Sequence, residues 1–91
     1  MSSISSIALS GMNAAQTTLN STAHNIANLN TPGFQRQEVV QSARAEGGVS
    51  ASVVQSAVAG ASVATDVVAQ LQAKNSFLAN LAVFKTGNQL A

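Results

Sequence analysis

The sequence predicts a mainly α-helical fold, with two long helices, one at each end of the chain, that pair as an antiparallel coiled coil. Two observations support this class: an apolar heptad pattern that ends at a Pro-Gly pair, and a second apolar stripe in the last third of the chain. We expect residues 1–36 to form the first helix and its exit, 37–64 a short β-hairpin or irregular connector, and 65–91 the second helix. A connector this short favours antiparallel pairing.

The first helix begins among serines whose hydroxyls can cap free amides. One face then carries apolar or small residues at alternating steps of four and three: Ala8, Met12, Ala15, Leu19, Thr22, Ile26 and Leu29. The opposite face is made of Ser, Asn, Gln and Thr and is almost uncharged. Such a surface suits hydrogen-bonded packing against neighbours better than it suits solvation in isolation.

We expect the first helix to end before Pro32, which lacks an N–H and disfavours a helical conformation at Thr31, while Gly33 permits a turn. Asparagines crowd this exit, where their amides can bond free carbonyls or their backbones can adopt left-handed angles: Asn25, Asn28 and Asn30. We expect Phe34, just after the turn, to dock on a neighbouring subunit.

The middle segment is rich in Val, Ser, Ala and Gly. Alternating residues flank Gly47 and Gly48, with Val39, Gln41 and Ala43 before them and Val49, Ala51 and Val53 after them. This pattern fits either a short hairpin or a flexible linker. Residues 56–62, around Gly60, are expected to be the loosest part.

The second helix should run from about Thr65 or Asp66 to about Gln89, with Asp66 at its positive end and Lys85 near its negative end. We expect a helix-pairing seam that joins Met12, Leu19, Ile26 and Leu29 to Val67, Leu71, Leu78 and Leu81. Phe77 and Phe84 flank this stripe as candidate contacts between subunits.

Composition points towards assembly. The 91 residues allow one small domain, only 8% are charged against about 25% in ordinary globular chains, and the aromatic residues are three Phe. The net charge of +1 predicts no nucleic-acid partner. The absence of an apolar run of about eighteen residues predicts no membrane span, and the N-terminal region lacks the pattern of a cleaved secretory signal.

No catalytic or cofactor chemistry is expected. His24 is the single histidine, cysteine is absent, and Glu38, Glu46 and Asp66 are too dispersed to form an acid–base pair. We therefore predict no enzyme activity, no metal site and no cofactor.

Two segments resemble a known family. Residues 25–28 read Asn-Ile-Ala-Asn and residues 30–34 read Asn-Thr-Pro-Gly-Phe, followed by the basic Arg36. This wording resembles the N-terminal signature of the bacterial flagellar rod, hook and hook-associated proteins. The Gln-Glu-Val-Val stretch at residues 37–40 is most similar to the proximal rod proteins. Residues 66–86 look like the C-terminal helix of the same family, although Asn75, Ser76 and a short middle segment depart from its pattern.

The resemblance implies a structural subunit whose terminal helices line the axis of a helical tube. It implies export, unfolded, through the flagellar export apparatus to the basal body rod, where the partners are other copies and other rod or hook subunits. The implied assembly motif is Asn25, Asn28, Asn30, Thr31, Pro32, Gly33 and Phe34.

Two alternatives remain on the residues alone. One is a secreted two-helix adaptor or effector that binds a partner helix. The other is a helix lying on a membrane surface, which the near absence of Lys and Arg on the polar face disfavours.

Overall fold

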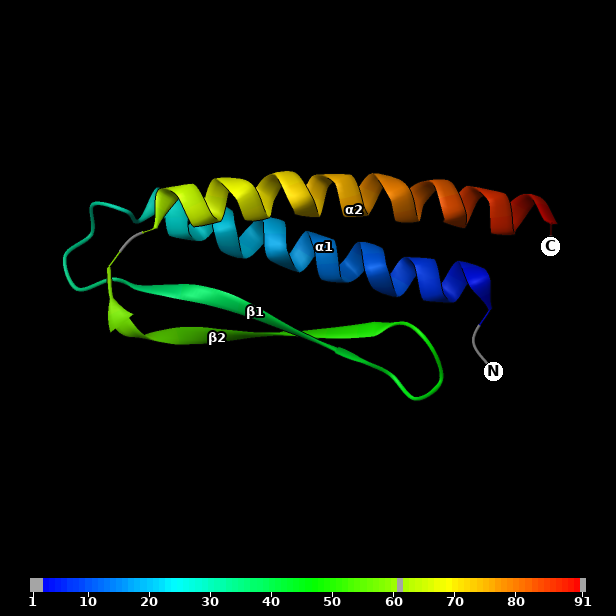
Figure 1. The fold of residues 1–91 in the computed structure, drawn as a ribbon, viewed down its shortest axis with the longest axis horizontal. Helices are drawn as coiled ribbons and strands as arrows, with labels where there is room; N and C mark the ends of the chain where they lie inside the picture. Colours follow the sequence, from blue (N-terminus) through cyan, green and yellow to red (C-terminus); the bar gives the residue numbers. More distant parts are fainter. Residues whose placement is uncertain (1–2, 61, 91) are drawn as a thin grey trace.

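The chain folds into an antiparallel pair of helices with a two-stranded antiparallel sheet between them in sequence, as seen in a computed structural model that describes residues 3–60 and 62–90. Helix α1 spans Ile4–Ala27, strands β1 and β2 span Gln35–Ala43 and Val49–Ala59, and helix α2 spans Val63–Leu90. Figure 1 shows α1 between the hairpin and α2, with both ends of the chain at the same end of the molecule. The Cα trace measures 51 × 23 × 13 Å.

Helix α1 begins as the serine-rich start predicts. Ser3 is its N-cap and accepts a hydrogen bond from the Ser6 backbone N–H at 3.1 Å. The helix ends at Ala27, before Pro32 as expected, but residues 28–33 form turns, so Leu29 and Asn30 lie beyond the helix rather than in its last turn. The cap explains the early end: Asn28 donates from Nδ2 to the His24 carbonyl at 2.9 Å, satisfying an acceptor of the last turn.

The helices pair antiparallel, as predicted, but the residues at their contact are small or polar. A Cβ added to Gly11 would lie 2.7 Å from the Asn80 amide, and one added to Gly87 would lie 2.7 Å from Ser5 Oγ. The most buried apolar side chains are all alanines: Ala8, Ala14, Ala15 and Ala73. Because side-chain size sets the distance between helix axes, small residues allow a close approach. The contact between α1 and α2 therefore differs from a coiled coil, in which large side chains interlock.

The hairpin alternative for the middle segment is confirmed. Val39 pairs with Val53, Gln41 with Ala51 and Ala43 with Val49, so the predicted alternation places these residues opposite one another. Strand β1 starts at Gln35, before the expected boundary, with an irregular register between Gln35 and Gln37.

The expectation of a loose segment at residues 56–62 is wrong over its first part, because β2 continues to Ala59. Residue 61 lies outside the described residues. Gly60 donates its N–H to the Phe34 carbonyl at 3.0 Å, which fastens the end of β2 beside the start of β1.

The hairpin tip rests on the first half of α1. Gly47 and Gly48 both have positive φ, at 103° and 88°. Ser10 Oγ accepts a hydrogen bond from the Val49 N–H at 3.1 Å, and a Cβ on Gly48 would lie 2.5 Å from that same oxygen. Glycine is therefore required at residue 48 both by the backbone angle and by the close approach.

Helix α2 begins at Val63, where the Ser62 carbonyl accepts the N–H of Asp66 at 3.0 Å. Asp66 thus lies in the first turn, at the positive end of the helix dipole, as expected. No helix within the described part of the chain is long and apolar enough to cross a membrane.

Candidate assembly surfaces

The end of α1, the start of β1 and the start of α2 meet at one buried polar cluster. Asn25 is 2% exposed and Asp66 is 3% exposed. The Asn25 side chain accepts from the Gln37 N–H at 2.7 Å and donates to the Gln37 carbonyl at 2.9 Å, as a neighbouring strand would. It also donates to Asp66 Oδ1 at 3.2 Å. Asn25 therefore joins all three elements, rather than bonding a carbonyl of its own helix as the sequence suggested.

Arg36 supplies the charge that Asp66 needs in this position. The Arg36 guanidinium reaches Asp66 with two nitrogens: Nε donates to Oδ2 at 3.3 Å, and Nη2 forms an ion pair with Oδ1. A buried carboxylate without such a partner would be strongly destabilising. The Asp66 hydrogen bond, which outweighs the opposing effect of burial, raises the pKa of Arg36. Because the folded pKa of Arg36 is the higher one, the stability that the Arg36 guanidinium gains from this contact is present throughout the neutral range and is lost as the pH rises into strong alkali.

The sequence did not reveal this ion pair. Arg36 was noted only as the basic residue after the motif, and Asp66 only as a charge at a helix start. Thirty positions separate them, and no local pattern links the two.

The turn after α1 is built by Pro32 and Gly33. The Phe34 N–H donates to the Thr31 carbonyl at 3.2 Å across the Pro-Gly pair, and Gly33 has φ of 72°. Proline before a glycine with positive φ fits a type II turn. No non-glycine residue in the described ranges has positive φ, so the asparagines of the exit do not use left-handed angles.

Phe34 is half-buried against its own chain. Its ring lies 5.4 Å from the His24 ring, centroid to centroid, at an interplanar angle of 59°. His24 thus packs against the ring of Phe34. The remaining motif residues Asn30, Thr31, Pro32 and Gly33 are exposed, and Asn28 is half-buried. That Phe34 also contacts a neighbouring subunit stays a prediction.

The predicted seam divides between covered and exposed positions. On α1, Met12, Leu19 and Ile26 are half-buried, while Leu29 lies beyond the helix and is 39% exposed. On α2, Leu81 is half-buried, but Val67, Leu71 and Leu78 are 42%, 58% and 51% exposed. In the single chain, therefore, the α2 half of the seam mostly faces away from α1. The physical reason is that Ala73 and other small residues occupy the contact face instead.

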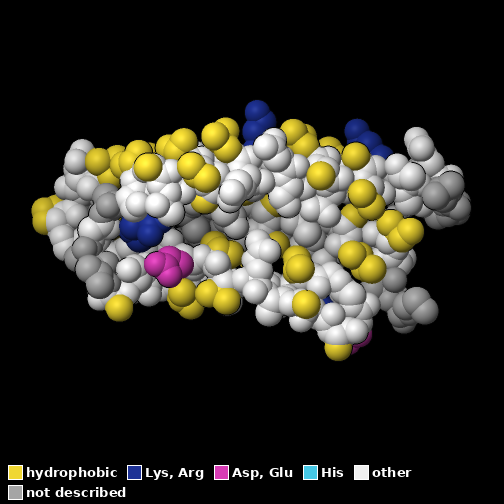
Figure 2. All heavy atoms as spheres, viewed as in Figure 1, with side chains coloured by type: hydrophobic (Ala, Val, Ile, Leu, Met, Phe, Trp, Pro, Cys, Tyr) yellow, Lys and Arg dark blue, Asp and Glu magenta, His cyan; other side chains and the backbone are white. Residues whose placement is uncertain are grey.

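This leaves an exposed apolar stripe on α2, which we define as Val67, Leu71 and Leu78. These residues recur at helical spacing on one side of the helix. Figure 2 shows hydrophobic side chains spread along the edge formed by α2, with basic side chains between them. Phe77 and Phe84, the candidate contacts between subunits, are half-buried beside it. Large apolar side chains aligned on one helix face are typical of a surface that is covered by another protein.

The described residues include no group of three His, Cys, Asp or Glu side chains that can hold a metal ion. The buried polar cluster, which we call the exit cluster, consists of the Asn25 amide, the Arg36 guanidinium and the Asp66 carboxylate, which satisfy one another. Its arrangement suits a structural joint between elements.

Comparison with known proteins gives a match over α1 and the turn that follows it. Residues 6–35 match the model of a family described as flagella basal body rod protein. The matched stretch covers most of α1 and its exit through Phe34. No curated protein matches the chain significantly. The resemblance to the flagellar rod family is thereby confirmed over this N-terminal third of the chain. The family is structural rather than enzymatic.

Proposed function

We propose that this protein is a subunit of the bacterial flagellar basal body rod that assembles with copies of itself and with other rod or hook subunits into a helical tube. The observation that carries the proposal is the family match over residues 6–35, which coincides with α1 and its exit. The exposed apolar stripe supports it, because Val67, Leu71 and Leu78 need a partner that the single chain does not supply.

The low charge of the chain supports the same proposal. A protein with 8% charged residues and an exposed apolar helix face has little to keep it dispersed as a monomer. Delivery to the rod unfolded, through the flagellar export apparatus, is part of the proposal, as is a position in the rod that spans the periplasm.

The test is Leu78→Asp. Leu78 is half-exposed in the single chain, so a carboxylate there remains hydrated and the helical pair still forms. In an assembled rod the same carboxylate would be buried without a partner. We expect this variant to be exported, to show the circular dichroism of the parent, and to be missing from isolated basal bodies.

Ser52→Asp, on the exposed outer side of the hairpin, is the matched control and should be incorporated normally. Leu19→Asp, which lies half-buried on α1, should fail to assemble as well. Normal incorporation of Leu78→Asp would refute a role for the stripe in assembly. A parent chain that stays a folded monomer at all concentrations would favour the secreted adaptor.

A further inference from the structure

A shallow groove follows α1 between the hairpin and α2. Among the described residues, the backbones of α2 and of the hairpin approach α1 but not each other. Three depressions of about 220, 170 and 250 Å³ follow one another along this gap. The first and second share Gln41 and Ser76, and the second and third share Thr18 and Ala69. We call this continuous feature the central groove.

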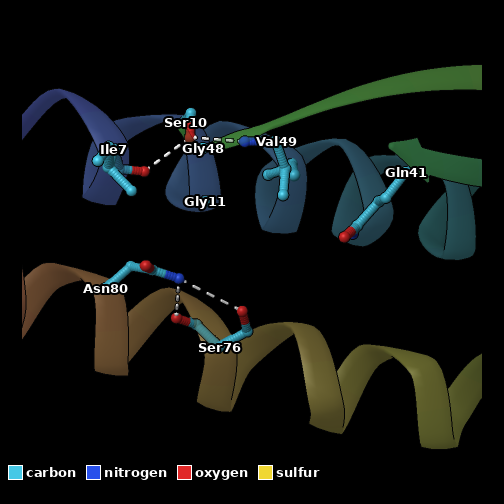
Figure 3. A pocket seen from close by; sticks show the side chains of 9 residues that line it. Ile7, Ser10, Gly11, Gln41, Gly48, Val49, Ser76 and Asn80 are labelled. Carbon is cyan, nitrogen blue, oxygen red and sulfur yellow. Dashed lines mark hydrogen bonds between the residues drawn. The ribbon is translucent and has the colours of Figure 1, made fainter. Parts of the chain in front are cut away.

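The walls of the central groove mix polar and apolar side chains, and those of the first two depressions carry no charge. Figure 3 shows its first depression, with Gln41 from β1 on one side and Ser76 and Asn80 from α2 on the other. Gly11 on the floor adds no side chain that would fill the space. Charged residues line only the third depression, where Arg36 and Asp66 neutralise each other and Glu38 is a further acidic residue. An occupant of the first two depressions therefore needs side chains that donate and accept hydrogen bonds without bringing a charge.

Helix α1 has that chemistry on its outer side. The span Ile4–Ala27 contains no Asp, Glu, Lys or Arg. Asn13, Gln16 and Asn20 are exposed at helical spacing, and Gln16 Nε2 donates to Asn20 Oδ1 at 3.1 Å. Amide side chains both donate and accept, so amides from two copies can satisfy one another when water is excluded.

The other exposed elements match less well. Helix α2 carries Lys74 and Lys85, and β1 carries Glu38, so each would bring a charge that the walls of the first two depressions do not compensate. Strand β2 is uncharged, but besides its single Gln it offers only short Ser, Ala and Val side chains.

We propose that the central groove binds the outer face of α1 from a second copy, with Asn13, Gln16 and Asn20 set against Gln41, Gln72 and Ser76. On one molecule the two surfaces lie on opposite sides of α1, because Asn13, Gln16 and Asn20 point away from the floor residues Gly11 and Thr18 at 100° per residue. Each copy thus offers a groove and a helix face together. Such a contact between unlike surfaces continues from copy to copy and forms an open assembly.

This proposal rests on self-assembly, and cross-linking between copies tests the two separately. The chain has no cysteine, so single-cysteine variants give an unambiguous result. Asn20→Cys chains and Gln72→Cys chains are mixed under conditions in which light scattering reports assembly, and are treated with a short bis-maleimide. We expect a covalent dimer from this mixture, and little from either variant alone. Asn20→Cys mixed with Val54→Cys, on the outer side of the hairpin, is the control and should give little dimer.

Assembly without preferential linkage of the Asn20→Cys and Gln72→Cys chains would overturn the groove proposal and leave self-assembly standing. A chain that does not assemble under any condition would count against both.

A second variant tests the chemistry of the groove. Gln41→Lys places an unpaired charge in the groove and should raise the concentration needed for assembly about tenfold. Ser52→Lys should leave that concentration unchanged. Equal effects of the two substitutions would refute burial of Gln41 by a second copy.

Discussion

At the scale of single residues, Asn25 has the most connections of any side chain in the assembly motif. The sequence identified its position, because the asparagine-rich exit stands out beside the Pro-Gly pair. It did not identify its partners. Gln37 lies on β1 and Asp66 on α2, so both contact Asn25 only in the folded chain. Nothing in the sequence around Gln37 or Asp66 distinguishes them from an ordinary residue of a strand or of a helix start.

Asn25→Ala should destabilise the fold by about 1–3 kcal/mol. The substitution leaves the Gln37 N–H and carbonyl without their side-chain partner and removes one donor to the buried Asp66 carboxylate. Urea denaturation followed by circular dichroism measures the change in free energy of unfolding.

Asn13→Ala is the matched control, since Asn13 is exposed on the same helix, and should change stability by less than about 0.5 kcal/mol. Equal effects of the two alanine substitutions would show that the exit cluster contributes nothing particular to the fold.

At the scale of elements, the sequence predicted the number and type of the helices correctly and gave the correct pairing of the hairpin as one of two readings. Periodicity and turn residues act within a few positions of the chain, so they predict the helices and the hairpin without knowledge of the tertiary contacts. The contact between the helices differs from the predicted seam in the single chain, where Leu71 and Leu78 are mostly exposed. Close approach of two backbones instead selects glycine, alanine and serine. The large side chains then remain on the outer side of α2, where a single sequence cannot distinguish an intrachain seam from a surface for another subunit.

Gly11→Leu should therefore weaken the helical pair, although glycine is a poor helix former. A Cβ at residue 11 already meets the Asn80 side chain at 2.7 Å, and that amide donates to the Ser76 carbonyl at 2.8 Å. Overpacking at such a contact typically costs about 1–3 kcal/mol, more than the roughly 1 kcal/mol gained in helix propensity. The melting temperature should fall.

Ala23→Leu, on the exposed side of the same helix, should leave the melting temperature nearly unchanged. A Gly11→Leu chain more stable than its parent would mean that the helices are farther apart than described.

At the scale of the whole molecule, α1 is the central element, and it packs against both α2 and the hairpin. Amides in the middle of α1, around Ala14 and Ala15, should exchange with solvent deuterium more slowly than those of β2 around Val53 and Val54. Mass spectrometry of the labelled, pepsin-digested chain measures the difference. Faster exchange in α1 than in β2 would show that the hairpin, and not the helical pair, is the most stable part of the fold.

The order of the elements along the chain has a consequence for the timing of assembly. Asn25 and Gln37 are twelve positions apart, so α1 and the hairpin can join while α2 is still being synthesised. Asp66 reaches Asn25 and Arg36 later, and Val67, Leu71 and Leu78 come with it, since the exposed apolar stripe lies entirely on α2. This exposed apolar surface therefore emerges from the ribosome after the hairpin, and a nascent chain that has reached only the hairpin has nothing of this stripe to expose to its neighbours.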